Sequence, residues 1–284
     1  MTQRHTSREH RPASLPEMGP KDIHRAEEEE PLGADITHEV IRRQGAHQLG
    51  RSTSALAWSG LAAGLAMGLS VMAQGLLHSH LPDAHWRHLV VSLGYTIGFL
   101  VVILGSQQLF TESTLTAVVP LLAERSRAML GNVARLWGVV LAANLVGALV
   151  FAWVIGRTEL FDPEVKRSFD EISREAMRGA FGTKVLKGIV AGWLIALMAW
   201  MLPSAGGSKV LVILILTYLV ALAKLTHVVA GATEAFYLAV TGGQSWGAAL
   251  GGYVLPALIG NVIGGAILVA ALNHAQVVAG GRKA

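Results

Sequence analysis

The feature that most constrains how this chain can fold is its long stretches without charged residues. Residues 52–77 form a run of 26 residues with no charged side chain, and about 20 apolar residues let an α-helix cross the hydrocarbon core of a bilayer. The chain is 52% hydrophobic and only 15% charged, with a mean hydropathy of +0.48. These values are typical of a membrane protein. We therefore expect an all-α integral membrane protein with the lipid bilayer as its surroundings.

Six apolar segments have the length of a membrane span or of an interrupted span. They cover residues 52–77, about 89–122, 136–155, 188–202, 210–240 and 246–272. We expect a polar cytoplasmic tail with a short juxtamembrane helix at 1–50, a six-span transporter domain at 51–275, and a second tail at 276–284. Inside the domain we expect two repeats, at about 52–156 and 186–273. The helix of the first tail is expected at about 35–49, either solvated or acting as a plug under a pore. The polar linker 156–187 is expected to hold a surface helix.

The fifth segment contains ionisable residues inside an apolar run. Lys224, His227 and Glu234 lie within residues 221–240, with Gly231 among them. Ionisable groups at membrane depth are costly, and they usually face a cavity or a partner. We therefore expect a transmembrane helix that is broken in the middle, with its polar groups turned toward a pathway.

A second segment resembles the first. Residues 105–120 read GSQQLFTESTLTAVVP, and Thr111-Glu112 matches Thr233-Glu234 because each pair is followed by Ala-Val at the same spacing. Two interrupted apolar segments at corresponding positions of two halves point to a transport site. The sequence therefore predicts that spans 2 and 5 are broken and meet near the bilayer midplane.

Two later spans share a further pattern. Asn144 is followed three residues later by Gly147, and Asn261 is followed in the same way by Gly264. In a helix each pair lies on one face, where a small residue permits close backbone approach. Three spans in each half give the halves opposite orientations, so we expect an inverted repeat of three plus three spans.

Basic residues in short loops indicate which ends of the spans face the cytoplasm. They fall before span 1, between spans 2 and 3, between spans 4 and 5, and at the end of the chain: Arg42, Arg43, Arg51, Arg125, Arg127, Arg135, Lys209, Arg282 and Lys283. We therefore expect both termini in the cytoplasm of a bacterial cell, with the protein in the inner membrane. The linker 156–187 carries seven basic residues on the other side, which conflicts with this rule.

Composition excludes several other classes. The chain has no cysteine, so it has neither disulfides nor thiolate metal ligands. The net charge of +4 is spread over span ends and tails, so we expect no nucleic-acid partner. The spacing of His78, His80, His85 and His88 matches no metal-ligand pattern. We expect no metal, no cofactor and no enzymatic activity, because no nucleophile motif or phosphate-binding loop accompanies the ionisable residues.

Four stretches together resemble the formate/nitrite transporter family. They are LFTEST at Leu109–Thr114, NLVGALVF at Asn144–Phe151, Thr226-His227 in span 5, and IGNVIGGAILV at Ile259–Val269. The resemblance implies an aquaporin-like protomer with six spans and a pore of its own, assembled into a homopentamer. It also implies transport of small monovalent inorganic or carboxylate anions of weak acids.

The resemblance also implies roles for individual residues. His227 would be the central histidine of the pathway, with Thr111 as its hydrogen-bond partner. Tyr95, Phe99 and Val220 would line an outer constriction, whereas Phe110, which follows Leu109, and Ile195 would line an inner one. Many family members have Gly-Phe-Glu-His-Ser where this chain has Lys224-Leu-Thr-His-Val, and an asparagine where it has Gly231. Glu112 and Glu234 are further departures, so the pore chemistry is expected to differ.

Lys224 leaves two interpretations open. It could attract anions while His227 stays neutral, or it could pair with Glu112 or Glu234, because a lysine inside a membrane is stabilised by an acidic partner. We expect the pair with Glu112 in the opposite broken helix. Three functions remain in competition: an anion pathway that is coupled to protons through His227, a pore for a small neutral solute, and a non-conducting sensor or scaffold that a Lys–Glu pair closes.

Overall fold

The computed structural model describes residues 33–280, and that part of the chain is helical with no strand. Its α-helices are α2 (Ala34–Gly50), α3 (Thr53–His80), α4 (Arg87–Leu104), α5 (Phe110–Thr116), α6 (Val118–Ala123), α7 (Arg127–Arg157), α8 (Pro163–Ala176), α9 (Phe181–Met201), α10 (Lys209–Leu222), α11 (Ala230–Thr241), α12 (Trp246–Ala249), α13 (Leu255–Val262) and α14 (Leu272–Gly280). Four short elements complete the path: the 3₁₀ turns η1 (Leu202–Ser204) and η2 (Gly206–Ser208), and the π-helical segments η3 (Leu250–Val254) and η4 (Ile263–Ala271). The expected disordered tail, and the charges of Arg282 and Lys283, lie outside the described residues.

Five helical segments in the described range are long and apolar enough to cross a membrane. They are Thr53–His80, Arg87–Leu104, Arg127–Arg157, Phe181–Ser204 and Trp246–Ala279. Two shorter apolar segments, Phe110–Ala123 and Gly206–Leu222, accompany them. The helical fold with helices long and apolar enough to span a membrane is therefore confirmed, whereas five such segments, not six, lie in the described range.

Several helices are longer than the apolar segments that predicted them. The third and fourth segments were expected at 136–155 and 188–202, but α7 begins at Arg127 and α9 begins at Phe181. Charged residues such as Arg135 and Lys184 therefore lie inside these helices. An uncharged run of sequence ends at its first charged residue, whereas the helix itself continues beyond that residue.

Two apolar segments are divided by short non-helical stretches. Residues 105–109 separate α4 from α5, and residues 223–229 separate α10 from α11. Ser106 (φ 52°) and Lys224 (φ 49°) are the non-glycine residues with positive φ in the described range. A left-handed residue ends an α-helix because it turns the chain away from the helix axis.

Two close helix contacts form the centre of the bundle. Helix α3 packs on α7, and α9 packs on α13 and η4. A Cβ atom on Gly64 would lie 2.2 Å from the backbone oxygen of Asn144, and one on Gly192 would lie 2.4 Å from that of Asn261. Only glycine permits these approaches, which bring each asparagine to the middle of the bundle.

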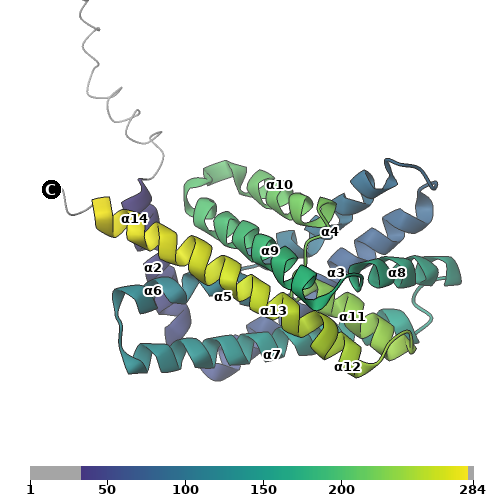
Figure 1. The fold of residues 1–284 in the computed structure, drawn as a ribbon, viewed down its shortest axis with the longest axis horizontal. Helices are drawn as coiled ribbons and strands as arrows, with labels where there is room; N and C mark the ends of the chain where they lie inside the picture. The colour runs from purple at the N-terminus through teal and green to yellow at the C-terminus, as the bar shows by residue number, and fades with distance from the viewer. Residues whose placement is uncertain (1–32, 281–284) are drawn as a thin grey trace, which may run out of the picture. The chain divides into compact units, whose positions relative to one another are not determined.

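The bundle has two distinct ends. Figure 1 shows α2, α6 and α14 at one end and α8 at the opposite end. At the first end Ile41 and Leu49 of α2 are buried, and Gln48 accepts a hydrogen bond of 2.7 Å from the Thr116 hydroxyl. Helix α2 is therefore packed on the bundle along one face rather than solvated all round. Helix α8 is the surface helix that was expected in the polar linker.

Candidate functional site

Asn144 holds the backbone of the first break. Its side-chain oxygen accepts a hydrogen bond of 2.9 Å from the backbone N–H of Phe110. Its amide nitrogen donates to the carbonyl oxygens of Gly60 at 2.7 Å and Gln108 at 3.0 Å. Asn144 is fully buried, so it satisfies the N–H at the start of α5 and a carbonyl of the break, and it ties both to α3.

Asn261 makes the same three bonds in the second break. Its side-chain oxygen accepts from the backbone N–H of Val228 at 2.8 Å. Its amide donates to the carbonyl oxygens of Gly188 and Thr226, both at 2.9 Å. Asn261 is also fully buried, so the two breaks are held by equivalent side chains.

These bonds define which residues correspond between the two breaks. The pairs are Ser106 with Lys224, Gln108 with Thr226, Leu109 with His227, and Phe110 with Val228. By the same alignment Glu112 falls opposite Ala230, whereas Glu234 falls opposite Thr116. The expected match between Thr111-Glu112 and Thr233-Glu234 is therefore wrong by about one helical turn, because short identical strings recurred by chance in similar apolar surroundings.

His227 lies between the two breaks with both ring nitrogens engaged. Nε2 lies 2.9 Å from the Thr111 hydroxyl oxygen, and Nδ1 accepts a hydrogen bond of 3.2 Å from the backbone N–H of Ala230. A nitrogen that accepts carries no proton, so the neutral ring holds its proton on Nε2 and donates it to Thr111. The side chain is 1% exposed, so the arrangement fixes one tautomer of a buried imidazole.

Aromatic rings cover the imidazole on one side. Phe99 packs edge-on against His227 with the ring centres 5.1 Å apart, and Tyr95 packs on Phe99 at 5.3 Å. Phe110, on the next helix, packs on Trp137 at 5.8 Å. The two remaining residues of the predicted constrictions, Ile195 and Val220, are fully buried, and so is Leu109.

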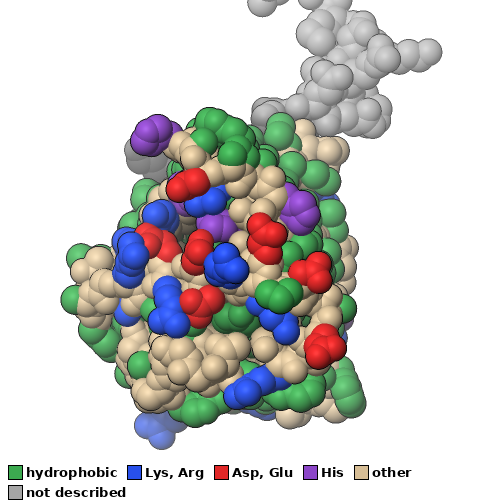
Figure 2. Space-filling view, turned by 90° about the vertical axis from the view of Figure 1, so that its right-hand side faces the viewer, with side chains coloured by type: hydrophobic (Ala, Val, Ile, Leu, Met, Phe, Trp, Pro, Cys, Tyr) green, Lys and Arg blue, Asp and Glu red, His purple; other side chains and the backbone are tan. Residues whose placement is uncertain are grey.

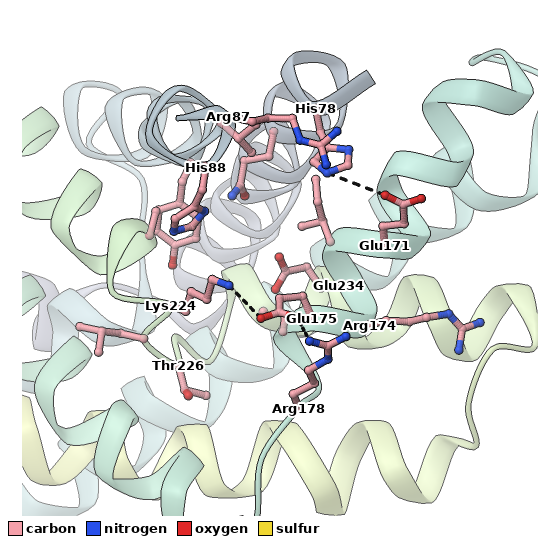
Figure 3. A pocket seen from close by; sticks show the side chains of 18 of the residues that line it. His78, Arg87, His88, Glu171, Arg174, Glu175, Arg178, Lys224, Thr226 and Glu234 are labelled. Atoms are coloured by element: carbon pink, nitrogen blue, oxygen red, sulfur yellow. Dashed lines mark hydrogen bonds and ion pairs between the residues drawn. The ribbon is translucent and has the colours of Figure 1, made fainter. Parts of the chain in front are cut away.

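A cavity of about 620 Å³ opens beside these rings at the end of the bundle that carries α8. Tyr95, Thr226, Gly231, Glu234 and Tyr253 line its buried part. Five basic residues and four acidic ones also line it: Arg87, Arg174, Arg178, Lys187, Lys224, Asp83, Glu171, Glu175 and Glu234. Figure 2 shows charged side chains of both signs and histidines gathered on this end of the molecule, and Figure 3 shows those that surround the cavity.

Lys224 pairs with a residue that the sequence did not indicate. Its ammonium nitrogen lies 2.8 Å from a carboxylate oxygen of Glu175 on α8, and Arg178 holds the other oxygen at 2.6 Å. The hydrogen bond from Lys224 lowers the pKa of Glu175. The Lys224 side chain is 50% exposed, so this pair closes part of the cavity mouth rather than locking the membrane interior.

The expected pair between Lys224 and Glu112 or Glu234 is therefore wrong. Residues 223–229 are not helical, so the side chains of Lys224 and His227 do not share a helix face. The left-handed conformation of Lys224 instead turns the chain so that its side chain reaches the cavity mouth, which Figure 3 shows. Glu112 lies on α5 and is absent from the cavity lining.

Gly231, for which the resemblance implied an asparagine in many relatives, faces a tyrosine. A Cβ atom on Gly231 would lie 1.8 Å from the Tyr253 hydroxyl oxygen, so Tyr253 occupies the space that a side chain would need. Tyr253 and Glu175 were not predicted from the sequence, and the acidic content of the linker was the one signal for Glu175. In the described part of the chain, no group of three or more His, Asp or Glu residues is arranged to hold a metal ion.

Sequence comparisons give the chain clear relatives. The model of the formate/nitrite transporter family matches residues 35–275. The inner membrane protein YfdC of Escherichia coli (strain K12) is 40% identical over 257 residues, which is 90% of this chain and 83% of that protein. The uncharacterized transporter YrhG of Bacillus subtilis (strain 168) is 28% identical over 181 residues, which is 62% of this chain and 66% of that one.

Solved structures share the fold. A pentameric formate channel with formate bound superposes with a TM-score of 0.66 at 18% sequence identity, covering 80% of this chain and 98% of that chain. An FNT family ion channel superposes with a TM-score of 0.68 at 20% identity, covering 84% and 98%. These similarities extend over nearly the whole length of both channels.

Proposed function

Because this chain belongs to the formate/nitrite transporter family, we propose that it is an inner-membrane channel or transporter for small monovalent anions of weak acids. The relative YfdC is named an inner membrane protein, and one structural neighbour is a formate channel with formate bound. The helices long enough to cross a membrane fit a multi-pass protein.

One observation carries this proposal. The two breaks place a single imidazole, His227, and the Thr111 hydroxyl between them, 2.9 Å apart and fully buried. The rings of Phe99 and Tyr95 separate this pair from a cavity that carries more basic than acidic side chains. A polar pair inside an apolar, interrupted helix bundle is the arrangement that a membrane pathway requires.

The geometry also supports a mechanism for passage. Basic residues at the cavity attract an anion, but an anion that enters the apolar constriction loses its water at a large cost in free energy. Passage as the neutral acid avoids most of that cost. The Thr111 hydroxyl, which accepts from His227, would then donate a hydrogen bond to the acid between the two constrictions.

Three finer features belong to the same proposal. The segments α4–α5 and α10–α11 would each form one broken span, which gives six spans in an inverted repeat with Asn144 and Asn261 in equivalent places. Both termini would face the cytoplasm, so that the cavity at α8 opens outside. A pentamer with one pathway in each protomer is supported by the pentameric formate channel that shares the fold.

The test is substrate-driven flux in proteoliposomes that enclose a pH-sensitive dye. Formate, nitrite, hydrosulfide, acetate and lactate are offered to the wild type and to His227→Ala. We expect at least one anion to enter together with acid, and we expect that flux to be lost in the variant. Absence of flux for every anion, from a protein shown to be an intact oligomer, would contradict the proposal. Uptake of neutral solutes without any flux of acid would instead favour a pore for small neutral molecules.

A further inference from the structure

Glu234 differs from the other acidic residues of the cavity. Asp83 lies 3.0 Å from Arg87, Glu171 lies 3.8 Å from His78, and Glu175 pairs with Lys224. Within residues 33–280, Glu234 has no ion pair and no side-chain hydrogen bond, although it is only 7% exposed. The proposed function therefore leaves one buried carboxyl group without a role.

The position of Glu234 connects it to the pathway. It lies on α11, the helix that starts directly after the second break, and it lines the cavity together with Tyr95 and Tyr253. Figure 3 shows its carboxyl group in the same cavity that Lys224 reaches. Tyr95 packs on Phe99, which packs on His227, so Glu234 borders the last open space before the aromatic constriction.

A buried charge without a partner costs free energy, and either a bound cation or a proton removes that cost. Five basic side chains line this cavity, and they oppose the entry of a metal ion or an organic cation. A neutral carboxylic acid needs an acceptor for its hydrogen, and the cavity contains an acceptor on Gln74. Its side-chain oxygen is buried without a partner among the described residues, and it lines the same cavity.

His227 is poorly placed to supply a proton to a molecule in the cavity. Nδ1 accepts from the Ala230 backbone, and Nε2 donates to Thr111. The ring of Phe99 also lies between the imidazole and Tyr95. The titratable and charged groups that line the same cavity from other elements include His78 on α3, Arg87 and His88 on α4, and Glu171 on α8. His78, Arg87 and Glu171 are each paired with another residue, and a ring nitrogen of His88 lies 3.0 Å from the Leu222 carbonyl oxygen.

We propose that Glu234 delivers the proton with which a weak-acid anion enters the constriction. The proton moves from the Glu234 carboxylic acid to the anion, giving a Glu234 carboxylate and the neutral acid. The acid passes Tyr95 and Phe99, and the carboxylate takes a new proton from water at the cavity mouth. One proton then crosses with each anion, so no net charge crosses the membrane. This step rests on the proposed anion pathway.

The test compares Glu234→Gln with Glu112→Gln in the full chain. Glutamine keeps the size and polarity of the side chain but carries no transferable proton. Glu112 is the matched control because it also lies on the helix that follows a break but does not line the cavity. We expect E234Q to slow acid-coupled flux by about 100-fold, the lower end of what a positioned proton donor contributes, and to flatten its dependence on pH. E112Q should keep the wild-type flux and its dependence on pH.

Infrared spectroscopy gives a readout that does not depend on transport. The difference spectrum between the wild type and E234Q should contain the C=O stretch of a protonated carboxylic acid, and that of E112Q should leave this band in place. Absence of the band, or wild-type flux and pH profile in E234Q, would overturn the assignment of Glu234 alone. Absence of flux for every anion in the wild type would overturn the anion pathway and the delivery step with it.

Discussion

The two breaks of this protein share a backbone and differ in chemistry. Residues 105–109 and 223–229 turn at a left-handed residue, and each break is held by three hydrogen bonds from one buried asparagine. At equivalent places, however, the first break has Leu109 and the second has His227. Ser106 of the first break is likewise matched by Lys224 of the second.

This difference separates two tasks. Closing the backbone of an interrupted helix inside lipid needs the same solution twice, because unpaired N–H and C=O groups are costly there. Handling a substrate needs one set of functional side chains, and under the proposed function the second break with α11 would carry it: Lys224 at the cavity mouth, Glu234 in the cavity and His227 behind the rings. On that proposal the backbone shared by the two breaks provides the scaffold, and the places where the two breaks differ provide the chemistry.

The largest expected effect comes from removing either asparagine. Asn144→Leu leaves the buried N–H of Phe110 and the carbonyl of Gln108 without a partner. Asn261→Leu does the same to the N–H of Val228 and the carbonyl of Thr226. Each such group costs about 1–3 kcal/mol. We expect both variants to lose several degrees in Tm and to assemble poorly, by similar amounts, in thermal unfolding and size-exclusion chromatography.

Asn132→Leu is the control for this prediction because Asn132 is exposed on the same helix as Asn144. It should keep the Tm of the wild type. If one of the two buried asparagines proved dispensable while the other did not, the two breaks would not share a scaffold and the comparison would fail.

A smaller effect should follow from relaxing the two left-handed residues. A non-glycine residue in this conformation costs about 1–2 kcal/mol, and glycine removes that cost at an entropic penalty of about 0.5–1 kcal/mol. Ser106→Gly should therefore stabilise the protein slightly. Lys224→Gly gains the same relief but loses the Glu175 pair, worth about 0–1 kcal/mol when exposed, so it should stabilise less.

A sharper test introduces Ser106→Gly and Lys224→Gly into a protein that already carries Glu175→Gln. Without the carboxylate partner, Ser106→Gly and Lys224→Gly should change the Tm by equal amounts. A persistent difference would show that Lys224 contributes through a contact other than the pair with Glu175.

The smallest expected effect is a pH dependence confined to the second break. The hydrogen bond from Lys224 lowers the pKa of Glu175, so the pair contributes stability above the ordinary pKa of a glutamate, about 4.3, and loses it as the pH falls through the lowered value. The difference in Tm between the wild type and Glu175→Gln should shrink over that acid range. A difference that stayed constant would mean that Glu175 acts through packing and not through its charge.

Much of the scaffold was predictable from the sequence because it depends on local patterns. Uncharged runs predicted the apolar helices, and the spacing from Asn144 to Gly147 and from Asn261 to Gly264 marked two helix faces. Both glycines lie against backbone: a Cβ on Gly147 would lie 2.6 Å from the Leu61 oxygen, and one on Gly264 would lie 2.1 Å from the Ile189 oxygen. Thr111 also lies within hydrogen-bond distance of His227, as the family resemblance implied.

The partner of Lys224 was not predictable from the sequence. A helical spacing rule placed Lys224 on the face of His227, but the positive φ of Lys224 redirects its side chain. The partner Glu175 is 49 residues away in the sequence and lies in a polar linker, so no local pattern connects the two. The lack of a partner for Glu234 also depends on tertiary structure, because it becomes visible only when every neighbour is placed.

The most direct test of this account is the anion flux of His227→Leu beside that of Leu109→Ala, measured in proteoliposomes at matched oligomer content. His227→Leu gives the second break the residue of the first, whereas Leu109→Ala alters the equivalent place in the first break and leaves the second unchanged. If the chemistry belongs to the second break, His227→Leu assembles but loses acid-coupled flux, and Leu109→Ala retains it. Wild-type flux in His227→Leu, or an equal loss in both variants, would contradict the division between scaffold and chemistry.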